Sequence, residues 1–164
     1  MLFRSPVDRV LSLYDYWREV APAGNGRGPE LAKTHSLDAF LDLTVGAVVA
    51  DVHNAQTWQI AFAHDGHTRK SILAERDLEA IYKQALANLE AIDVVGVQED
   101  LPGFMQALSY KFGWRLSVPK PVNVTDKRRR RADIPLATLR KIHKLVEADI
   151  ELYARARSLA RVDG

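Results

Sequence analysis

The chain contains no cysteine among its 164 residues. This absence excludes a disulfide framework, a thiolate metal site and a cysteine nucleophile. No apolar stretch approaches the roughly 20 residues that cross a bilayer, and the first residues lack the basic and apolar regions of a signal peptide. We therefore expect a cytoplasmic protein without a membrane partner.

An excess of charge of one sign is also lacking, because 23 basic residues stand against 21 acidic ones and the net charge is +2. Such a balance gives no reason to expect nucleic acid as the partner. The exception is a basic run formed by Lys127, Arg128, Arg129, Arg130 and Arg131. Three interpretations stay open for this run: a solvated loop, a contact with a nucleotide phosphate or an anionic sugar, and nucleic-acid binding.

Metal-ligand spacing is the third absence. The chain has five histidines, and none of them forms a pair of the HExxH kind. Catalytic zinc sites use imidazole and carboxylate ligands gathered at such spacings. We therefore expect no metal.

Apolar residues make up 47% of the sequence, which is enough for the core of a single domain over residues 1–164. The apolar periodicity predicts strands at residues 1–4 and 93–98, the second of them buried and parallel. It predicts helices from residue 5, from residue 36, over 48–63, 76–91 and 101–112, and one long final helix from residue 134, with loops at 22–29, 64–70 and 119–131. Few strands among many helices indicate a helix-rich α/β fold.

The start of the chain places a helix directly after a strand. The strand ends at Arg4, and Ser5 follows as a residue that can cap a helix. Pro6 suits the first helical position, and Asp8 completes an S-x-x-D capping box. The free amides at the helix start and the guanidinium of Arg4 then point to one place, which is suitable for a phosphate.

On that helix, Arg9 and Ser12 lie three residues apart and share a face. An arginine fork and a hydroxyl donor are suitable partners for a terminal phosphate monoester. A second interpretation stays open, in which Arg4 and Arg9 are surface charges and Ser12 has no special role.

The spacing Arg4-x-Pro6-x-x-Arg9-x-x-Ser12 resembles the second cofactor motif of sulfotransferases that use 3′-phosphoadenosine 5′-phosphosulfate (PAPS). The resemblance implies that Arg4 and Ser12 hold the 3′-phosphate of the nucleotide and that Arg9 supports them. It also implies that the basic loop 127–131 closes over the cofactor or steers an anionic acceptor.

Further segments resemble the carbohydrate and heparan-sulfate branch of this family, in the same order along the chain. They are Asn54-x-Gln56-Thr57, Ala87-Asn88-Leu89 followed by residues 93–99, Leu108 to Trp114, Val122 to Thr125, and Asp149 to Tyr153. Glu99, at the end of the second strand, is a candidate acceptor-site residue.

The resemblance implies the helix-rich part of a P-loop-type sulfotransferase domain with a short parallel sheet. In the family, a first strand and a phosphosulfate-binding loop precede the Arg4 motif, so we expect both to be missing from this chain. The implied function is transfer of a sulfuryl group from PAPS to a hydroxyl, such as that of a glycan, with no catalytic residue assigned. The alternative is an inactive, truncated member that acts as a nucleotide- or partner-binding helical module and can self-associate.

Overall fold

A computed structural model describes residues 1–22, 24, 26–62, 77–118 and 129–160. It is a helix-rich α/β chain with a short parallel sheet, as the sequence predicts. The chain divides into two compact units. The sheet unit comprises Met1–Pro6, Gln56–Lys120 and Ala148–Gly164, and the helical unit comprises Val7–Ala55 and Pro121–Glu147.

The sheet of the sheet unit consists of two parallel strands, β1 (Leu2–Phe3) and β2 (Gly96–Val97). Leu2 lies opposite Gly96. The predicted parallel pairing at residues 93–98 is confirmed, but β2 is shorter than predicted. Its ladder ends because the chain turns at once into a 3₁₀ helix, η1 (Gln98–Asp100).

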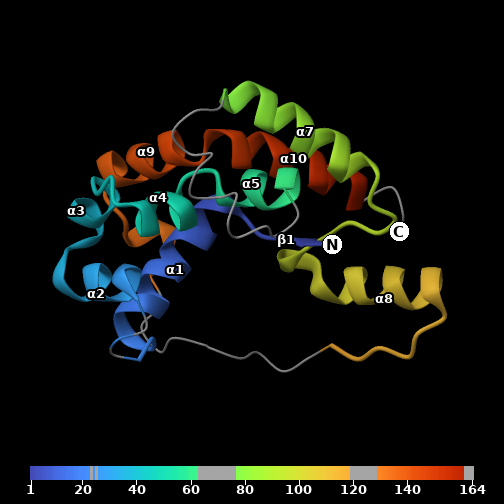
Figure 1. Cartoon of the computed structure of the whole chain (residues 1–164). Helices are drawn as coiled ribbons and strands as arrows, with labels where there is room; N and C mark the ends of the chain where they lie inside the picture. Colours follow the sequence, from blue (N-terminus) through green and yellow to red (C-terminus); the bar gives the residue numbers. More distant parts are fainter. Residues whose placement is uncertain (23, 25, 63–76, 119–128, 161–164) are drawn as a thin grey trace. The chain divides into compact units, whose positions relative to one another are not determined.

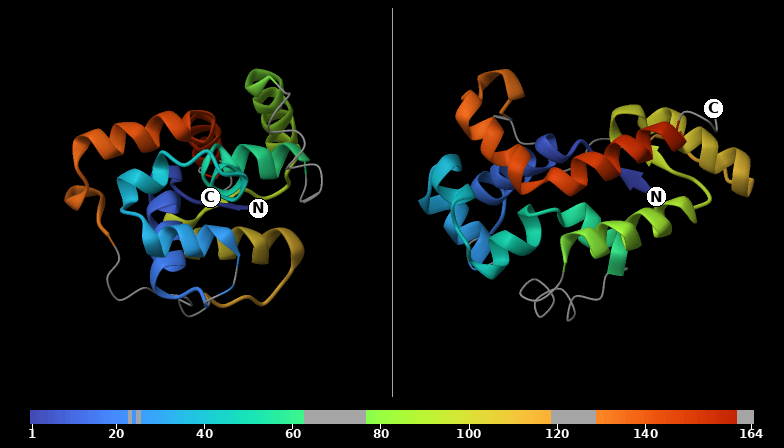
Figure 2. Two further views of the ribbon diagram at one scale, coloured as in Figure 1. Left: turned by 60° about the vertical axis from the view of Figure 1, so that its left-hand side comes forward. Right: turned by 90° about the horizontal axis from the view of Figure 1, so that it is seen from above.

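Helices cover both faces of this sheet (Figure 1 and Figure 2). One face packs on α5 (Ala55–Phe62), α7 (Leu78–Glu90) and α10 (Glu147–Ala160), and the other on α8 (Leu101–Phe112). Val95 and Val97 belong to the core on the first face. Between them, Gly96 turns to α8, where a Cβ atom would lie 2.2 Å from the Phe104 ring.

The helical unit contains most of α1 (Pro6–Glu19), with α2 (Arg27–Thr34), α3 (Leu37–Leu41), α4 (Gly46–Val52), the 3₁₀ helix η2 (Arg131–Asp133) and α9 (Leu136–Leu145). Tyr14 of α1 and Phe40 of α3 are fully buried and meet edge to face, with ring centroids 5.2 Å apart. Val48, Ile142 and Val146 are buried in this unit too. Its interior is therefore built from apolar stripes on short helices.

Two predicted helix boundaries are confirmed, the start of α3 and the end of α8, whereas α7 begins at Leu78, two residues later than predicted. The side chain of Ser36 caps α3 by accepting from the Ala39 N–H. Asp77 caps α7 through the Glu79 N–H. Gly113 ends α8 with φ 68°, in the left-handed region where glycine carries no steric cost.

The single helix predicted over residues 48–63 is wrong, because α4 ends at Val52 and α5 begins at Ala55. Asn54 lies between them with φ 45°. A left-handed residue ends the helical ladder, and asparagine is among the few residues that tolerate this conformation. Apolar periodicity continues through the break, which is why the pattern concealed it.

The single long final helix is also wrong. Helix α9 ends at Leu145 and α10 begins at Glu147. The carbonyl of Leu145 accepts from the Asn54 N–H at 3.1 Å, a partner from outside its own helix. Val146 departs from helical geometry at φ −123° and ψ 28°. The two halves also fall in different units.

The loop predicted at residues 22–29 extends too far, because α2 starts at Arg27. Pro29 fits there, since the first turn of a helix needs no proline N–H. Gly28 fits because a Cβ atom would lie 2.7 Å from the Trp17 ring. A close approach of two helices, rather than a turn, thus explains this glycine.

Candidate functional site

The carboxyl ends of β1 and β2 bring together residues that are far apart in the sequence. Arg4 and Ser5 follow β1, and Gln98 and Glu99 follow β2. Because the strands are parallel, these ends lie at one edge of the sheet. Ligand sites of α/β proteins form at this edge.

Gln56 fixes the backbone at the end of β1. Its Oε1 accepts from the Arg4 N–H at 3.1 Å, and its Nε2 donates to the Arg4 carbonyl at 3.0 Å. A side-chain amide offers one donor and one acceptor, as a peptide group does. Gln56 therefore satisfies the groups of Arg4 that a further strand would otherwise take.

Gln56 is itself held by Asp149 of α10, whose side chain is 1% exposed. The Asp149 carboxylate accepts from the Gln56 N–H at 3.2 Å, and from the Thr57 N–H and the Thr57 hydroxyl at 2.7 Å each. These amides belong to the first turn of α5, where no intrahelical acceptor exists. A carboxylate at a helix start also interacts favourably with the helix dipole.

Glu99 connects the end of β2 with α10. Its Oε1 accepts from the Ser5 N–H at 3.0 Å, and its Oε2 accepts from the Tyr153 hydroxyl at 2.8 Å. Both carboxylate oxygens thus have protein partners. This arrangement suits a structural link better than a general base, which needs an oxygen directed at the acceptor hydroxyl.

The residues predicted to bind the 3′-phosphate fall in two units. Arg4 belongs to the sheet unit, whereas Arg9 and Ser12 belong to α1 in the helical unit. All three are partly exposed. Arg9 donates from Nη1 to the carbonyl of Asp51 at 2.8 Å, so at least this part of its guanidinium serves packing. The phosphate-binding roles stay predictions.

The basic run is described only from Arg129 onward, because Lys127 and Arg128 lie outside the described residues, as do residues 122–125. Arg129 pairs with the fully buried carboxylate of Asp15, through its backbone N–H at 3.1 Å and through Nη1. Its guanidinium also lies over the Tyr14 ring, 4.9 Å from the centroid. Arg129 therefore neutralises a buried charge, which would be costly without a partner.

Arg130 and Arg131 are exposed. Arg130 lines a shallow cavity of about 620 Å³ in the helical unit, together with Asp38, Asp133 and Thr138. Acidic and basic groups are mixed there, so the cavity carries no single sign of charge. Arg131 makes a 3.5 Å contact with Asp8.

Comparison with known proteins gives no support from relatives. No family model, no curated protein and no solved structure matches the chain. The assignment of function therefore depends on the residues and their geometry.

Within the described ranges, no three histidine, aspartate or glutamate side chains are placed to hold one metal ion. None of the helices described has both the length and the apolarity that crossing a membrane requires. Among the described histidines, His53 has a distinctive setting: burial lowers its pKa, and its Nε2 has no hydrogen-bond partner in the described part of the chain. The sulfotransferase resemblance needs no metal, and that expectation stays a prediction.

Sequence reasoning did not foresee how the Asn54–Thr57 segment and the Asp149–Tyr153 segment connect. Gln56 and Thr57 bond to Asp149, and Glu99 bonds to Tyr153. One signal was available, because Asp149 lies between the apolar residues Ala148 and Ile150 of an otherwise amphipathic helix. A carboxylate on a buried face needs donors, and the nearest candidates are helix-start amides.

Proposed function

We propose that this chain is a member of the PAPS-dependent sulfotransferase family, with its P-loop-type fold, and that it binds the 3′-phosphate end of the nucleotide. In the reaction, the acceptor hydroxyl oxygen bonds to sulfur and loses its proton to a base. The bond from sulfur to the phosphate oxygen breaks, and adenosine 3′,5′-bisphosphate leaves. The acceptor is a glycan hydroxyl.

One observation carries the proposal: four of the segments that suggested the family meet at the carboxyl edge of the parallel sheet. Arg4 follows β1 and is hydrogen-bonded to Gln56. Asp149 accepts from the Gln56 N–H, and Glu99, at the end of β2, accepts from the Tyr153 hydroxyl. Motifs scattered by chance would have no reason to share hydrogen bonds. Their convergence at an edge where α/β proteins bind ligands supports a common function.

In this proposal, Gln56 fixes the backbone conformation of Arg4 through two hydrogen bonds. Arg4 and Ser12 donate to the 3′-phosphate, and the amides at the start of α1 add positive potential. Arg9, with Nη1 on the Asp51 carbonyl, holds α1 in place more than it binds phosphate. Arg130 and Arg131 add the cations of the basic loop.

A second candidate is an inactive module that retains nucleotide or partner binding. One observation favours it: the acidic groups near the proposed site are occupied by protein donors. Glu99 accepts from Ser5 and Tyr153, and Asp149 from Gln56 and Thr57. No general base is therefore assigned.

Calorimetric titration with adenosine 3′,5′-bisphosphate tests the proposed binding of the 3′-phosphate. Arg4→Ala and Ser12→Ala should each weaken binding at least about tenfold, since each removes a charge-assisted hydrogen bond. Arg140→Ala is the matched control, because it removes an exposed arginine of α9 and should leave the affinity unchanged. Adenosine 5′-phosphate, which lacks the 3′-phosphate, should bind weakly to all four proteins.

Equal affinity for the two nucleotides, or wild-type affinity in both site variants, would contradict the assignment of Arg4 and Ser12. Sulfuryl transfer from labelled PAPS to a glycan mixture separates the two candidates. Transfer supports the enzyme, whereas 3′-phosphate-specific binding without transfer supports the inactive module.

A further inference from the structure

Among the residues that the structure describes, the outer edge of β2 has no partner strand, unlike the edge that pairs with β1. The Gly96 N–H donates to the Met1 carbonyl at 2.9 Å, so the backbone groups of Gly96 point to β1. The Met1 amine donates to the Val94 carbonyl, so Val94 also faces β1. Val95 lies between Val94 and Gly96, directly before β2, and successive residues of an extended chain turn their backbone groups to opposite sides, so those of Val95 point outward. Within the described part of the chain, no backbone hydrogen bond reaches Val95.

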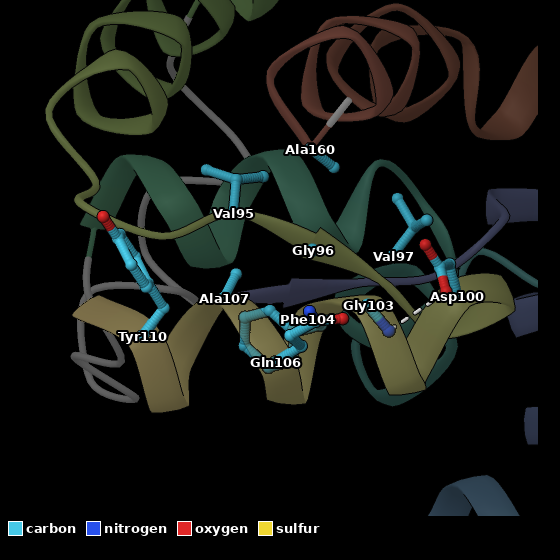
Figure 3. Close-up of a pocket in the computed structure, with 10 residues that line it drawn as sticks. All are labelled: Val95, Gly96, Val97, Asp100, Gly103, Phe104, Gln106, Ala107, Tyr110 and Ala160. Carbon is cyan, nitrogen blue, oxygen red and sulfur yellow. Dashed lines mark hydrogen bonds between the residues drawn. The ribbon is translucent and has the colours of Figure 1, made fainter. Parts of the chain in front are cut away.

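A groove of about 340 Å³ follows this open edge (Figure 3). Residues 95–97 form its floor, Ala160 of α10 lies on one side, and Phe104, Ala107 and Tyr110 of α8 lie on the other. Helices thus flank the edge on both faces of the sheet. A third strand placed here would be covered from both sides, as strands of parallel sheets usually are.

The same unit contains a segment with the pattern of a strand that pairs with no strand of the described residues. After α8, the residues Trp114, Arg115, Leu116, Ser117 and Val118 alternate between apolar and polar. This period of two is typical of a strand with one buried face. The apolar side chains are nevertheless 53%, 39% and 51% exposed, and the segment forms neither helix nor strand (Figure 1).

We propose that the groove receives residues 114–118 of a second copy as an added strand, so that two copies exchange strands reciprocally. Strand addition satisfies the outward backbone groups of Val95. It buries the shared apolar face of the segment against Phe104 and Ala107. The charges also match: Asp100 is the one charged side chain among the described residues that line the groove, and Arg115 is the one charge in the segment.

Reciprocal exchange gives an isologous dimer with two equal strand additions. One contact then covers both the outer edge of β2 and the apolar side chains of residues 114–118. An exposed strand edge and an exposed apolar segment each favour aggregation when they stay uncovered. The inference does not depend on the proposed sulfotransferase function, because none of these residues belongs to the Arg4 and Ser12 site.

Analytical ultracentrifugation over a concentration series, with circular dichroism to confirm folding, tests the dimer. Leu116→Pro removes an amide from the strand segment, and Ala107→Trp fills the groove. Each variant should raise the dissociation constant at least tenfold. Leu136→Lys is the matched control, because Leu136 is 61% exposed on α9, and this variant should dimerise like the wild type.

A mixture of the two variants gives the decisive result. Leu116→Pro keeps an intact groove and Ala107→Trp keeps an intact strand, so the mixture should form heterodimers that neither variant forms alone. A monomeric wild type at its highest soluble concentration would overturn the proposal. So would a dimer that both variants leave unchanged, a mixture that stays monomeric, or slow amide exchange at Val95 in a monomer.

Discussion

The two outer edges of the same small sheet differ in whether their outward backbone groups have hydrogen-bond partners. At the end of β1, the side chain of Gln56 accepts from the N–H of Arg4 and donates to its carbonyl. Directly before β2, Val95 lines a groove, and among the described residues no backbone hydrogen bond reaches it. One edge is closed by a polar side chain that imitates a peptide, and the other is available for a strand.

The difference follows from what lies behind each edge. Gln56 is positioned by Asp149 on α10, and Asp149 is buried and accepts from the first turn of α5. A long-range contact, 93 residues apart in sequence, therefore decides that the β1 edge is closed. The groove at the β2 edge is lined mainly by apolar residues, whose side chains satisfy no backbone group.

The largest effect is expected from Asp149→Ala, which removes the support of the closed edge. Three donors, two from backbone amides and one from the Thr57 hydroxyl, would lose a buried charged acceptor. The cost should be about 3–5 kcal/mol of unfolding free energy. Urea unfolding followed by circular dichroism measures it.

Two companions locate the source of that cost. Thr57→Val removes the hydroxyl donor and should cost about 1–2 kcal/mol. Asp149→Asn keeps an acceptor oxygen, so its loss of unfolding free energy should lie between those of Asp149→Ala and Thr57→Val. If Asp149→Ala were no worse than Thr57→Val, the α5 amides would have another acceptor, and the closed edge would not depend on α10.

Gly96→Ala comes next, because it tests the sheet face shared by both edges. Its Cβ would lie 2.2–2.6 Å from three atoms of Phe104, at the base of the side chain, where rotation gives no relief. Helix α8 would have to shift away from β2, at a cost of about 1–3 kcal/mol. Thermal unfolding measures the loss.

The double variant Gly96→Ala with Phe104→Ala is the control for Gly96→Ala. Loss of the ring atoms relieves part of the overlap, although the Cβ of residue 104 remains 2.6 Å from the new Cβ, so the double variant should be more stable than the sum of the two single effects predicts. Additive losses would mean that α8 does not press on Gly96.

Gln56→Ala should cost less, about 1–2 kcal/mol, because it removes two hydrogen bonds to partly buried backbone groups. Its distinctive consequence is local: amide exchange at Arg4 should speed up strongly, while exchange at Val95 should stay as it was. Hydrogen exchange read by NMR distinguishes the two edges. Equal acceleration at both positions would show that the sheet opens as a whole and that Gln56 does not act on one edge.

The sequence predicted those parts of the fold that local signals determine. Periodicity located α3, α7 and α8, and Ser36 and Gly113 marked the start of α3 and the end of α8. It failed where a residue distant in the chain intervenes. Asn54 interrupts one predicted helix, and its N–H takes the Leu145 carbonyl where the second interruption occurs.

The candidate site shows the same division. Arg4, Gln56, Glu99 and Asp149 all lie in segments that drew attention in the sequence, yet their pairing is a property of the folded chain. Arg129 is the clearest example. The run of five cations left open a solvated loop, a contact with a nucleotide phosphate or an anionic sugar, and nucleic-acid binding, whereas the structure pairs this arginine with buried Asp15. No local pattern specifies a partner 114 residues away.

The smallest expected effect is a pH dependence of stability. It tests the break between α4 and α5, residues 53–54, which precedes the helix that carries Gln56. His53 precedes Asn54 at this break, and burial lowers its pKa below the ordinary value of about 6.5. The unfolded chain then binds more protons between the folded pKa and 6.5, so stability is complete above pH 6.5 and declines as the pH falls through the folded pKa. Urea midpoints at pH 7.5 and 5.5 should show the decline, and His53→Gln should abolish most of it. The Asp38 carboxyl, whose pKa is lowered chiefly by its hydrogen bond with Lys141, titrates in a more acidic range and does not obscure the comparison. If the urea midpoints of His53→Gln kept the wild-type pH dependence, the proton uptake would occur at another residue. The stability of the protein would then not depend on the protonation of His53.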